Sequence, residues 1–328
     1  MIDGFGRKID YLRISVTDRC NFRCHYCMPE NQSFLPHGEL LDYTEIALLA
    51  ERFISHGIRK IRLTGGEPLV RRDMQILLAA LGKHVHSGRL DELTLTTNGS
   101  LLSKFSPILS DAGVRRINVS LDSLDPQKFA DITRGGKLDQ VMEGIAAAKK
   151  HNIHIKINMV AMKGVNEDDL LPIAHMCADA GHDLAIIETM PLGSEVGGRE
   201  NTYMPADVFI EPLRQISALT PIPHRTAGPS RYWLADALGL KIGMITPLSE
   251  NFCDDCNRLR LTTDGKIYMC LGSEMNVDFK TALREQGVEA VDRLLQKALR
   301  LKPERHEFEK QMANPNSRLS RTMNATGG

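Results

Sequence analysis

Three cysteines lie close together near the start of the chain, in the stretch Cys20-Asn21-Phe22-Arg23-Cys24-His25-Tyr26-Cys27. Three thiolates at this spacing can ligate three irons of a four-iron cluster and leave the fourth iron free to bind a molecule that is not protein. A structural zinc site is the alternative, but zinc usually takes four protein ligands, and His25 is badly placed between the cysteines to be the fourth. The triad follows a strand-like run, so the spacing favours an iron-sulfur cluster held by a short loop.

A second group of three cysteines, Cys253, Cys256 and Cys270, lies in the C-terminal part of the chain. One interpretation is a zinc site that His224 or His306 completes from a distance. The other is a second iron-sulfur cluster with a free iron. The sequence favours the cluster and leaves the zinc site as the alternative.

Two arginines follow the second cysteine group, Arg258 and Arg260. On a strand, residues two apart share a face, so both guanidinium groups can bind one anion. Surface salt bridges are the usual role of such arginines, but beside an open metal centre we expect a phosphate chain. The chain has no Gly-x-x-x-x-Gly-Lys-Ser/Thr motif, so separate Arg and Lys side chains would hold the phosphates of a bound nucleotide.

A glycine-rich turn, Gly65-Gly66-Glu67-Pro68, follows the second strand-like run. Glycines allow a backbone to approach a ligand closely, and such a turn offers amides or carbonyls to a charged group. Because it comes one strand-helix unit after the first cysteine group, we expect this turn to support whatever binds the open iron.

The elements that must position these motifs are alternating strands and helices, from Tyr11 to about Glu188, which predicts a parallel sheet. The expected strands are Leu12 to Val16, Lys60 to Thr64, Glu92 to Thr97, Arg116 to Leu121, His154 to Val160 and Leu184 to Thr189. Helical spacing is found at Ile46, Leu49, Ala50 and Phe53, at Met74, Leu77, Leu78 and Leu81, and at Leu170, Ile173, Ala174 and Cys177. Cys177 is therefore expected to pack as a small apolar side chain.

Polar residues alternate with apolar ones along five of these strands, so polar side chains share one face. They are Arg13 and Ser15; Arg62 and Thr64; Thr94, Thr96 and Asn98; Asn118, Ser120 and Asp122; and Lys156 and Asn158. A sheet with one solvated face is one interpretation. Regularly interspersed amphipathic helices favour the other, a sheet closed or half closed around a polar cavity.

Composition excludes several function classes. Lys plus Arg and Asp plus Glu both count 41, so no overall field attracts nucleic acid or an anionic membrane. No apolar run approaches the roughly 20 residues of a membrane span, and the first residues lack the apolar stretch of a signal peptide. We therefore expect a cytoplasmic protein, in which six of the seven cysteines act as ligands and not as disulfides.

The pattern changes after Glu188. A glycine-rich loop from Met190 to Gly198 precedes an expected helix near Pro205 to Leu219 and short strands to about Thr246. A clear helical pattern runs from Val288 to Leu301, and the polar tail after it is by default disordered.

Together these motifs resemble the GTP 3′,8-cyclases, the radical S-adenosylmethionine (SAM) enzymes that open molybdenum cofactor biosynthesis. The resemblance runs from Arg13 to Gly328 and includes Tyr26 in the cysteine loop, the Gly-Gly-Glu-Pro turn, Asn257-Arg258-Leu259-Arg260 and the terminal Gly327-Gly328. It implies an α/β fold, with a partial (β/α)6 barrel (an incomplete TIM barrel) at residues 1–190. A C-terminal α+β extension at residues 191–328 would close the open side and carry the Gly-Gly tail.

The resemblance also implies two 4Fe-4S clusters at opposite ends of the cavity, together with SAM. Cys20, Cys24 and Cys27 would ligate the first cluster, whose free iron binds SAM, and Cys253, Cys256 and Cys270 the second, whose free iron meets guanine. The positions that match SAM contacts are Tyr26, Gly66, Ser120 and Met190. Those that match GTP contacts are Arg13, Arg62, Thr96, Lys156, Arg258 and Arg260, with Lys156, Arg258 and Arg260 as the catalytic candidates.

In the implied reaction, cleavage of SAM gives a 5′-deoxyadenosyl radical that takes hydrogen from C3′ of GTP, and the sugar radical adds to C8 of guanine. The implied partners are GTP, an electron donor such as flavodoxin or ferredoxin, and a downstream pyranopterin-forming enzyme; a homodimer is compatible with the resemblance. The rival interpretations are a peptide-modifying radical SAM enzyme with an auxiliary cluster, and a non-enzymatic iron-sulfur or zinc protein.

The sequence departs from the family pattern at two places. Ala185 stands where the family commonly has an arginine, so a positive charge is missing. We expect one of three consequences: a neighbour such as Lys163 or Arg199 supplies the charge, the reaction is slower, or the substrate is a variant. The tail reads Asn324-Ala325-Thr326 where an aromatic and a branched residue often precede the two glycines, which makes its docking less certain.

Overall fold

A computed structural model of the chain describes residues 1–192, 199–226, 228–308, 319 and 321–327. Within these residues the strands form a single sheet of twelve, in the order β12-β11-β10-β1-β2-β3-β4-β5-β6-β9-β8-β7. The protein therefore has an α/β fold built on a mostly parallel sheet. The sheet is not closed, because its edge strands β12 and β7 do not pair with each other.

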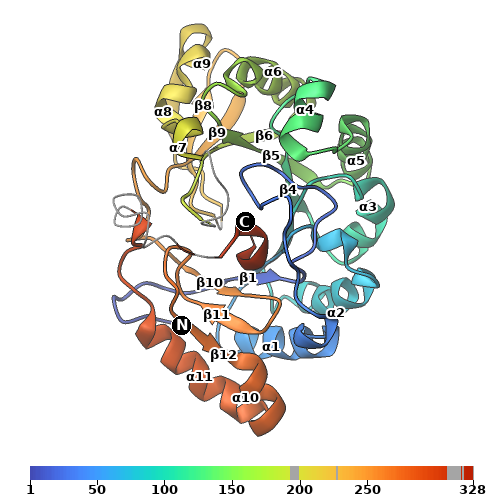
Figure 1. Cartoon of the computed structure of the whole chain (residues 1–328), viewed down its shortest axis with the longest axis vertical. Helices are drawn as coiled ribbons and strands as arrows, with labels where there is room; N and C mark the ends of the chain where they lie inside the picture. Colours follow the sequence, from blue (N-terminus) through green and yellow to red (C-terminus); the bar gives the residue numbers. More distant parts are fainter. Residues whose placement is uncertain (193–198, 227, 309–318, 320, 328) are drawn as a thin grey trace.

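Six successive parallel strands form the middle of the sheet. Their bounds are β1 Tyr11–Ser15, β2 Lys60–Thr64, β3 Glu92–Thr97, β4 Arg116–Ser120, β5 His154–Ala161 and β6 Asp183–Glu188. All six strand predictions are confirmed, with ends that agree to within one residue. Figure 1 shows the strands curving around the C-terminal end of the chain.

The connecting helices lie on the outer side of this curved sheet (Figure 1). The α-helices are α1 Tyr43–Ser55, α2 Met74–His86, α3 Leu102–Asp111, α4 Pro126–Thr133, α5 Leu138–Lys150 and α6 Leu170–Ala180. Short 3-10 helices occur at η1 His37–Glu39, η2 Pro68–Val70 and η3 Glu167–Asp169. Helix α1 begins at a capping box, in which Asp42 accepts from the backbone N–H of Glu45 and Glu45 from that of Asp42. Cys177 is fully buried in α6 and packs in the apolar core, as predicted.

The C-terminal part adds strands to both edges of the sheet. Strand β9 pairs in parallel with β6, and β10 pairs in parallel with β1. The added strands are β7 Leu219–Ile222, β8 Arg231–Ala235, β9 Leu240–Ile245, β10 Arg258–Leu261, β11 Lys266–Tyr268 and β12 Asn276–Asp278. The pairing of β10 with β1 places the second cysteine group and its arginines beside the first strand.

One expected helix differs from the prediction. The stretch predicted as one helix near Pro205 to Leu219 forms two short ones, α8 Ala206–Phe209 and α9 Glu211–Ile216, and Leu219 already begins β7. Pro212 lies in the first turn of α9, where its missing N–H costs nothing, whereas inside a continuous helix it would remove a hydrogen bond. The proline therefore explains the restart.

The remaining helices are α7 Arg199–Thr202, α10 Phe279–Gln286, α11 Val288–Leu301 and α13 Met323–Thr326. The prediction for α11 is confirmed at both ends. Its polar side ties it to α1, because Asp292 forms an ion pair with Arg52 and lies 2.9 Å from Nε2 of His56.

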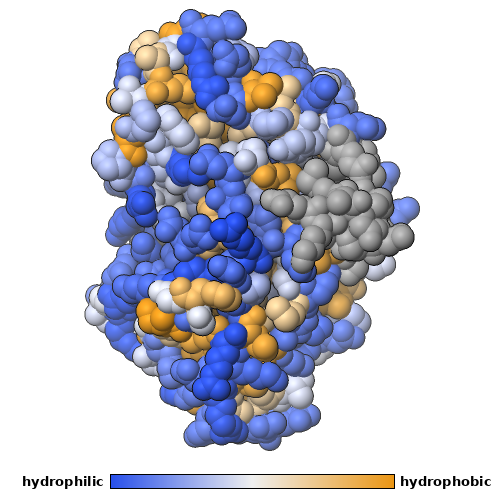
Figure 2. Space-filling model, turned by 90° about the vertical axis from the view of Figure 1, so that its left-hand side faces the viewer, coloured by the Kyte–Doolittle hydropathy of each residue, from blue (hydrophilic) through white to orange (hydrophobic). Residues whose placement is uncertain are grey.

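The surface is mixed in character. On the face shown in Figure 2, apolar residues lie in small groups among hydrophilic ones. No helix in the described part of the chain is both long and apolar enough to cross a membrane.

Candidate active site

The first cysteine group lies in the loop after β1, at the carboxyl ends of the parallel strands. Cys20, Cys24 and Cys27 are not joined in disulfides, and all three line one cavity. Burial raises the pKa of Cys20 to about 12, and Glu67 adds to the effect. Thiols held in this way need a positive centre to become thiolates, which fits iron ligands.

The glycine-rich turn packs directly against this loop. The backbone N–H of Gly66 donates to the carbonyl of Thr17 at 2.8 Å, and that of Glu67 to the carbonyl of Arg19 at 2.9 Å. A Cβ on Gly66 would lie 2.3 Å from the oxygen of Arg19. The close approach that requires glycine is therefore to the cysteine loop, so the turn positions the loop as well as lining the cavity.

Glu67 ties the turn to the next strand. Its carboxylate is fully buried and accepts hydrogen bonds from the backbone N–H groups of Leu69 (3.0 Å) and Asn98 (2.6 Å) and from the hydroxyl of Thr97 (2.8 Å). Burial raises its pKa to about 7. The sequence marked this turn as a support but did not single out Glu67.

All four positions expected to contact SAM line the cavity of the first cysteine group: Tyr26, Gly66, Ser120 and Met190. The hydroxyl of Tyr26 donates to Oδ2 of Asp122 at 2.8 Å, and Oδ1 of Asp122 accepts from the backbone N–H of Val160 at 2.8 Å. Burial raises the pKa of Asp122 to about 6. Asp122 was placed on the polar face by the sequence, but its role of fixing Tyr26 was not foreseen.

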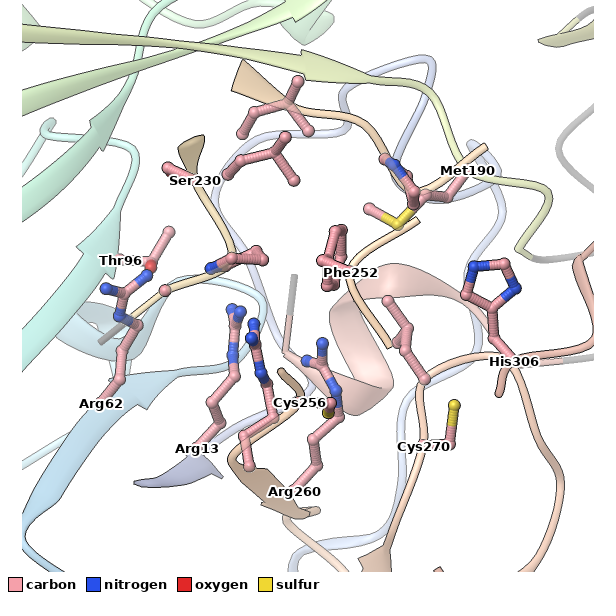
Figure 3. A pocket seen from close by; sticks show the side chains of 18 of the residues that line it. Arg13, Arg62, Thr96, Met190, Ser230, Phe252, Cys256, Arg260, Cys270 and His306 are labelled. Carbon is pink, nitrogen blue, oxygen red and sulfur yellow. The ribbon is translucent and has the colours of Figure 1, made fainter. Parts of the chain in front are cut away.

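The second cysteine group lines a second cavity, together with all six positions expected to contact GTP (Figure 3). Burial would raise the pKa of Cys256, but the nearby charges of Arg258 and Lys302 outweigh it and lower that pKa to about 6. Burial raises the pKa values of Cys253 and Cys270. A thiolate at Cys256 is thus favoured by the folded protein itself, which suits a metal ligand.

Five cations surround the second cavity and are almost completely buried. Their exposed fractions are 8% for Arg13, 6% for Arg62, 2% for Lys156, 6% for Arg258 and 7% for Arg260. Burial, followed by repulsion from Arg258, lowers the pKa of Arg260 to about 10. So dense a group of buried positive charges is costly unless an anion joins it.

The sheet register brings these cations together. Arg13 of β1 pairs with Arg62 of β2 on one side and with Arg260 of β10 on the other. The guanidinium groups of Arg62 and Arg258 lie 5.7 and 6.0 Å from the ring centre of Tyr11. Tyr11 was missed by the sequence analysis, although extending the polar alternation of Arg13 and Ser15 by one step would have found it.

Several donors in this cavity have no hydrogen-bond partner among the described residues. Among the described residues, the Nε atoms of Arg62 and Arg258 and the hydroxyl of Thr96 are buried without a hydrogen bond. Across the same residues, neither Arg62, Lys156, Arg258 nor Arg260 pairs with a carboxylate. Buried donors normally have partners, so these groups indicate a polyanionic ligand.

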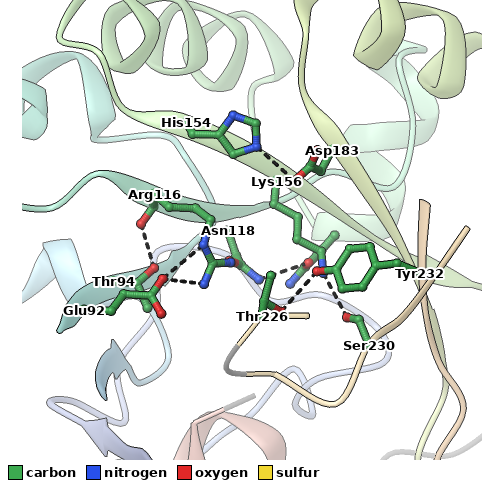
Figure 4. Close-up of polar contacts among 11 residues, drawn as sticks. Glu92, Thr94, Arg116, Asn118, His154, Lys156, Asp183, Thr226, Ser230 and Tyr232 are labelled. Atoms are coloured by element: carbon green, nitrogen blue, oxygen red, sulfur yellow. Dashed lines mark hydrogen bonds and ion pairs between the residues drawn. The ribbon is translucent and has the colours of Figure 1, made fainter. Parts of the chain in front are cut away.

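A network of side-chain hydroxyl groups holds Lys156 (Figure 4). Its ammonium donates to the hydroxyls of Tyr232 at 2.7 Å and Ser230 at 2.9 Å, and Thr226 is hydrogen-bonded to Tyr232 at 3.1 Å. Burial, with Arg62 and Arg116, lowers the pKa of Lys156 to about 7. These hydroxyls carry no charge, so Lys156 stays available to an anion.

The two cavities meet. Each contains about 1000 Å³ of empty space, part of it open to solvent. They share five lining residues, which are Thr96, Asn158, Ile187, Met190 and Met323. The two cysteine groups thus line two adjoining cavities on the polar face of the strands.

Residues 321–327 of the C-terminal tail enter this interior, so this part does not follow the default expectation of disorder. Asn324 and Thr326 are each 1% exposed, and the side-chain amide of Asn324 donates to the carbonyl of Asp18 at 2.8 Å. The carbonyl of Gly327 accepts from Arg260. The last residue of the expected Gly-Gly tail, Gly328, lies outside the described residues.

The sequence suggested Lys163 or Arg199 as a replacement for the positive charge that is missing at Ala185. Ala185 is fully buried and pairs with Asn158 and Gly243 in the sheet. Lys163 is exposed and lines neither cavity. The side chain of Arg199 lies outside the described residues. A compensating lysine at Lys163 is therefore not in place.

For a zinc site, His306 lines the cavity of the second cysteine group and His224 does not. Within the described ranges, no three His, Cys, Asp or Glu side chains come close enough to hold a single metal ion. Neither cysteine group has the compact geometry of a mononuclear zinc site. A larger cluster, with its ligands spread around it, fits three separated thiols better.

Comparisons with known proteins agree with this geometry. Residues 14–177 match the radical SAM superfamily, and residues 182–308 match the family described as Molybdenum Cofactor Synthesis C. The chain is 49% identical over 331 residues to a GTP 3′,8-cyclase of Paracoccus denitrificans, covering 100% of this chain and 96% of the relative. It is 48% identical over 329 residues to a GTP 3′,8-cyclase of Rhizobium meliloti, covering 100% and 94%.

Among solved structures, the fold is similar to Streptococcus suis SuiB bound to precursor peptide SuiA, with a TM-score of 0.66, 14% identity, and coverage of 94% of this chain and 74% of that one. SuiB bound to S-adenosylmethionine gives a TM-score of 0.61 at 14% identity, covering 88% and 68%. At this identity the likeness concerns the fold alone.

Proposed function

The chain belongs to the GTP 3′,8-cyclases of the radical SAM superfamily, and we propose that it cyclises GTP between two 4Fe-4S clusters, one at each cysteine group. This is the reaction that opens molybdenum cofactor biosynthesis. The observation that carries the assignment is the group of buried cations and unpartnered donors beside the second cysteine group, which calls for a polyphosphate.

At the first group, Cys20, Cys24 and Cys27 hold the cluster that binds SAM. The SAM contacts are Tyr26, Gly66, Ser120 and Met190, which line the same cavity. Asp122 keeps the ring of Tyr26 in place through its hydrogen bond, and Glu67 fixes the turn that carries Gly66. These residues orient SAM before any chemistry occurs.

At the second group, Cys253, Cys256 and Cys270 would hold the second cluster, which would supply an open iron for guanine. The GTP contacts are Arg13, Arg62, Thr96, Lys156, Arg258 and Arg260. Arg258 and Arg260 offer bidentate donors to the phosphates and Lys156 a point charge, and these three are the proposed catalytic residues. Their positions bring the ribose toward the first cavity.

When bound, the first cluster would pass one electron to SAM, which would split into methionine and a 5′-deoxyadenosyl radical. That radical would take the C3′ hydrogen of GTP to become 5′-deoxyadenosine, and the sugar radical would add to C8 of guanine; one further electron and one proton would complete the product. The protein's own contribution is to hold C3′ next to C5′ of SAM and to exclude other hydrogen donors and water. Met190 and Met323 lie where the two cavities meet and narrow the path between them.

We also propose roles for the two parts of the chain and for its partners. Residues 1–190 act as a partial (β/α)6 barrel, and residues 191–328 form the extension that covers its open side. The electron comes from a donor such as flavodoxin or ferredoxin, and the product passes to a pyranopterin-forming enzyme. The protein itself works in the cytoplasm and is compatible with a homodimer.

Anaerobic reconstitution followed by product analysis tests the proposal. With SAM, dithionite and GTP we expect about eight irons per chain, 5′-deoxyadenosine and a cyclised GTP product. About four irons would remove the second cluster. Zinc without iron, or 5′-deoxyadenosine formed with no GTP-derived product, would overturn the assignment, and the second result would point to a peptide substrate.

A further inference from the structure

A buried lysine lies beside the second cysteine group. Lys302 directly follows helix α11 and is only 2% exposed. An ammonium group taken out of water is costly unless hydrogen bonds and an opposite charge compensate it. Its partners therefore indicate what it does, and the inference below rests on the proposed second cluster.

Three acceptors surround the ammonium group of Lys302. Its Nζ lies 2.7 Å from the carbonyl of Met269, 3.1 Å from that of Arg258 and 3.3 Å from the sulfur of Cys256. An ammonium has three N–H donors, so all three are used. Met269 precedes Cys270 in the chain, and Lys302 thus connects the segments that carry two of the three thiols.

The sulfur is the acceptor that can carry the opposite charge. Among the described residues, Lys302 forms no ion pair with a carboxylate, and the two carbonyls are neutral. Of the three acceptors, only the sulfur of Cys256 gains a negative charge, when it ligates a metal as a thiolate. A hydrogen bond between two charged groups is about twice as strong as a neutral one.

The position of Lys302 is fixed from the opposite side as well. Arg7 donates to the carbonyl of Pro303 at 2.7 Å, to that of Glu304 at 2.7 Å and to that of Cys253 at 2.8 Å. The segment after Lys302 is thereby joined to the third thiol-bearing residue. These bonds fix the backbone that follows Lys302.

At the first cysteine group, the described contacts of Cys20 are of another kind. The sulfur of Cys20 accepts from the backbone N–H of Phe22 at 3.3 Å and lies 3.8 Å from the side-chain amide of Asn98, both neutral donors. The carboxylate of Glu67 acts on Cys20 and that of Asp122 acts on Cys24. Cys20 and Cys256 thus face nearby charges of opposite sign.

We propose that Lys302 is a positioning residue for the second cluster, and that its charged N–H···S hydrogen bond to Cys256 raises the reduction potential of that cluster. Such bonds withdraw electron density from the sulfur and stabilise the reduced cluster. Lys302 lines neither cavity, so it acts on the second cluster without contacting SAM or GTP.

The test compares variants of the full, reconstituted chain by iron analysis and EPR-monitored redox titration. Lys302→Met removes the charge and the donor, and Lys302→Gln keeps a neutral donor. We expect the oxidised-to-reduced ratio of the second cluster at fixed potential to rise about tenfold in Lys302→Met, a shift of about 59 mV to lower potential, with Lys302→Gln in between. The first cluster serves as an internal control.

Lys297→Met is the matched control, because Lys297 is an exposed residue of helix α11, which directly precedes Lys302. Its loss changes the net charge equally. It should leave both potentials unchanged. An unchanged second potential in Lys302→Met would overturn the inference, as would loss of the second cluster from both Lys302 variants, which would mean a purely structural role. A wild-type chain with about four irons would instead contradict the proposed function itself.

Discussion

The guanidinium group of Arg260 donates a hydrogen bond of 3.0 Å to the carbonyl oxygen of Gly327, 67 residues further along the chain. An arginine proposed to hold the phosphates of GTP is thus also in contact with the C-terminal tail. On its other side, Gly327 packs against Thr64 of β2. The tail therefore lies between the phosphate-binding cations and the first cavity, and its placement should affect catalysis.

Substitution of Gly327 tests this arrangement. Gly327 has φ +72°, and a Cβ there would lie 2.2 Å from Cγ2 of Thr64. We expect Gly327→Ala to displace the tail and to lower product formation from GTP on the order of 100-fold, because a shift near 1 Å is enough to misalign reacting groups. The control is Gly164→Ala, at φ +71° with nothing within 4 Å. Equal rates in both variants would contradict a role for the tail.

The second prediction concerns the phosphate contacts. In the Arg258→Ala, Arg260→Ala double variant we expect the Kd for GTP to rise at least about 100-fold, because two charged hydrogen-bonding groups are lost. SAM cleavage without substrate should persist, since neither arginine lines the first cavity. Arg225→Ala, which removes an arginine with an 84% exposed side chain, is the control. Equal loss of GTP binding and SAM cleavage would argue against the assignment.

Much of this site could be predicted from local sequence. The two-residue alternation placed Arg13, Arg62, Thr96 and Lys156 on one face of the strands, and all four line the second cavity. The alternation is readable because it reports on backbone geometry within a single strand.

What local sequence could not give is pairing over long distances. Strand β10 lies beside β1 in parallel, so that Arg260 pairs with Arg13. Such a register depends on how distant segments pack, and no short-range pattern encodes it. The same reason explains why Lys302 and Tyr232 were missed: each acts through a partner more than 40 residues away. In contrast, the break at Pro212 was visible in the sequence and was overlooked.

The third prediction is a pH dependence that arises from Lys156. The pKa of Lys156 is lowered from 10.5 to about 7, and a bound phosphate favours its charged form. GTP affinity should therefore fall as the pH rises above about 7, by up to about tenfold per unit, and binding should take up a proton. Calorimetry between pH 6 and 9 in buffers of different ionisation enthalpy measures both. The GTP phosphates themselves also titrate, so the effect is read as the difference from Lys156→Met.

The same shift has a consequence for stability. Because the folded pKa of Lys156 is below its unfolded value, the unfolded chain binds more protons between about pH 7 and 10.5. The free energy of unfolding without ligand should gain from this residue as the pH rises through that window. Chemical denaturation should find a steeper rise in wild type than in Lys156→Met. Identical slopes would mean that the pKa of Lys156 is not lowered in the folded protein.

The last prediction separates ligand cysteines from packing cysteines. Cys24→Ser should reduce the iron content from about eight to about four per chain and abolish SAM cleavage, because the first cluster loses a ligand while the second is untouched. Cys177→Ser is the matched control: this thiol is fully buried in the apolar core, so the variant should lose some stability and keep all its iron. If Cys24→Ser still cleaves SAM, the first group does not hold the cluster that the reaction needs. If Cys177→Ser loses iron to the same extent, the loss in Cys24→Ser reports general unfolding and not ligation.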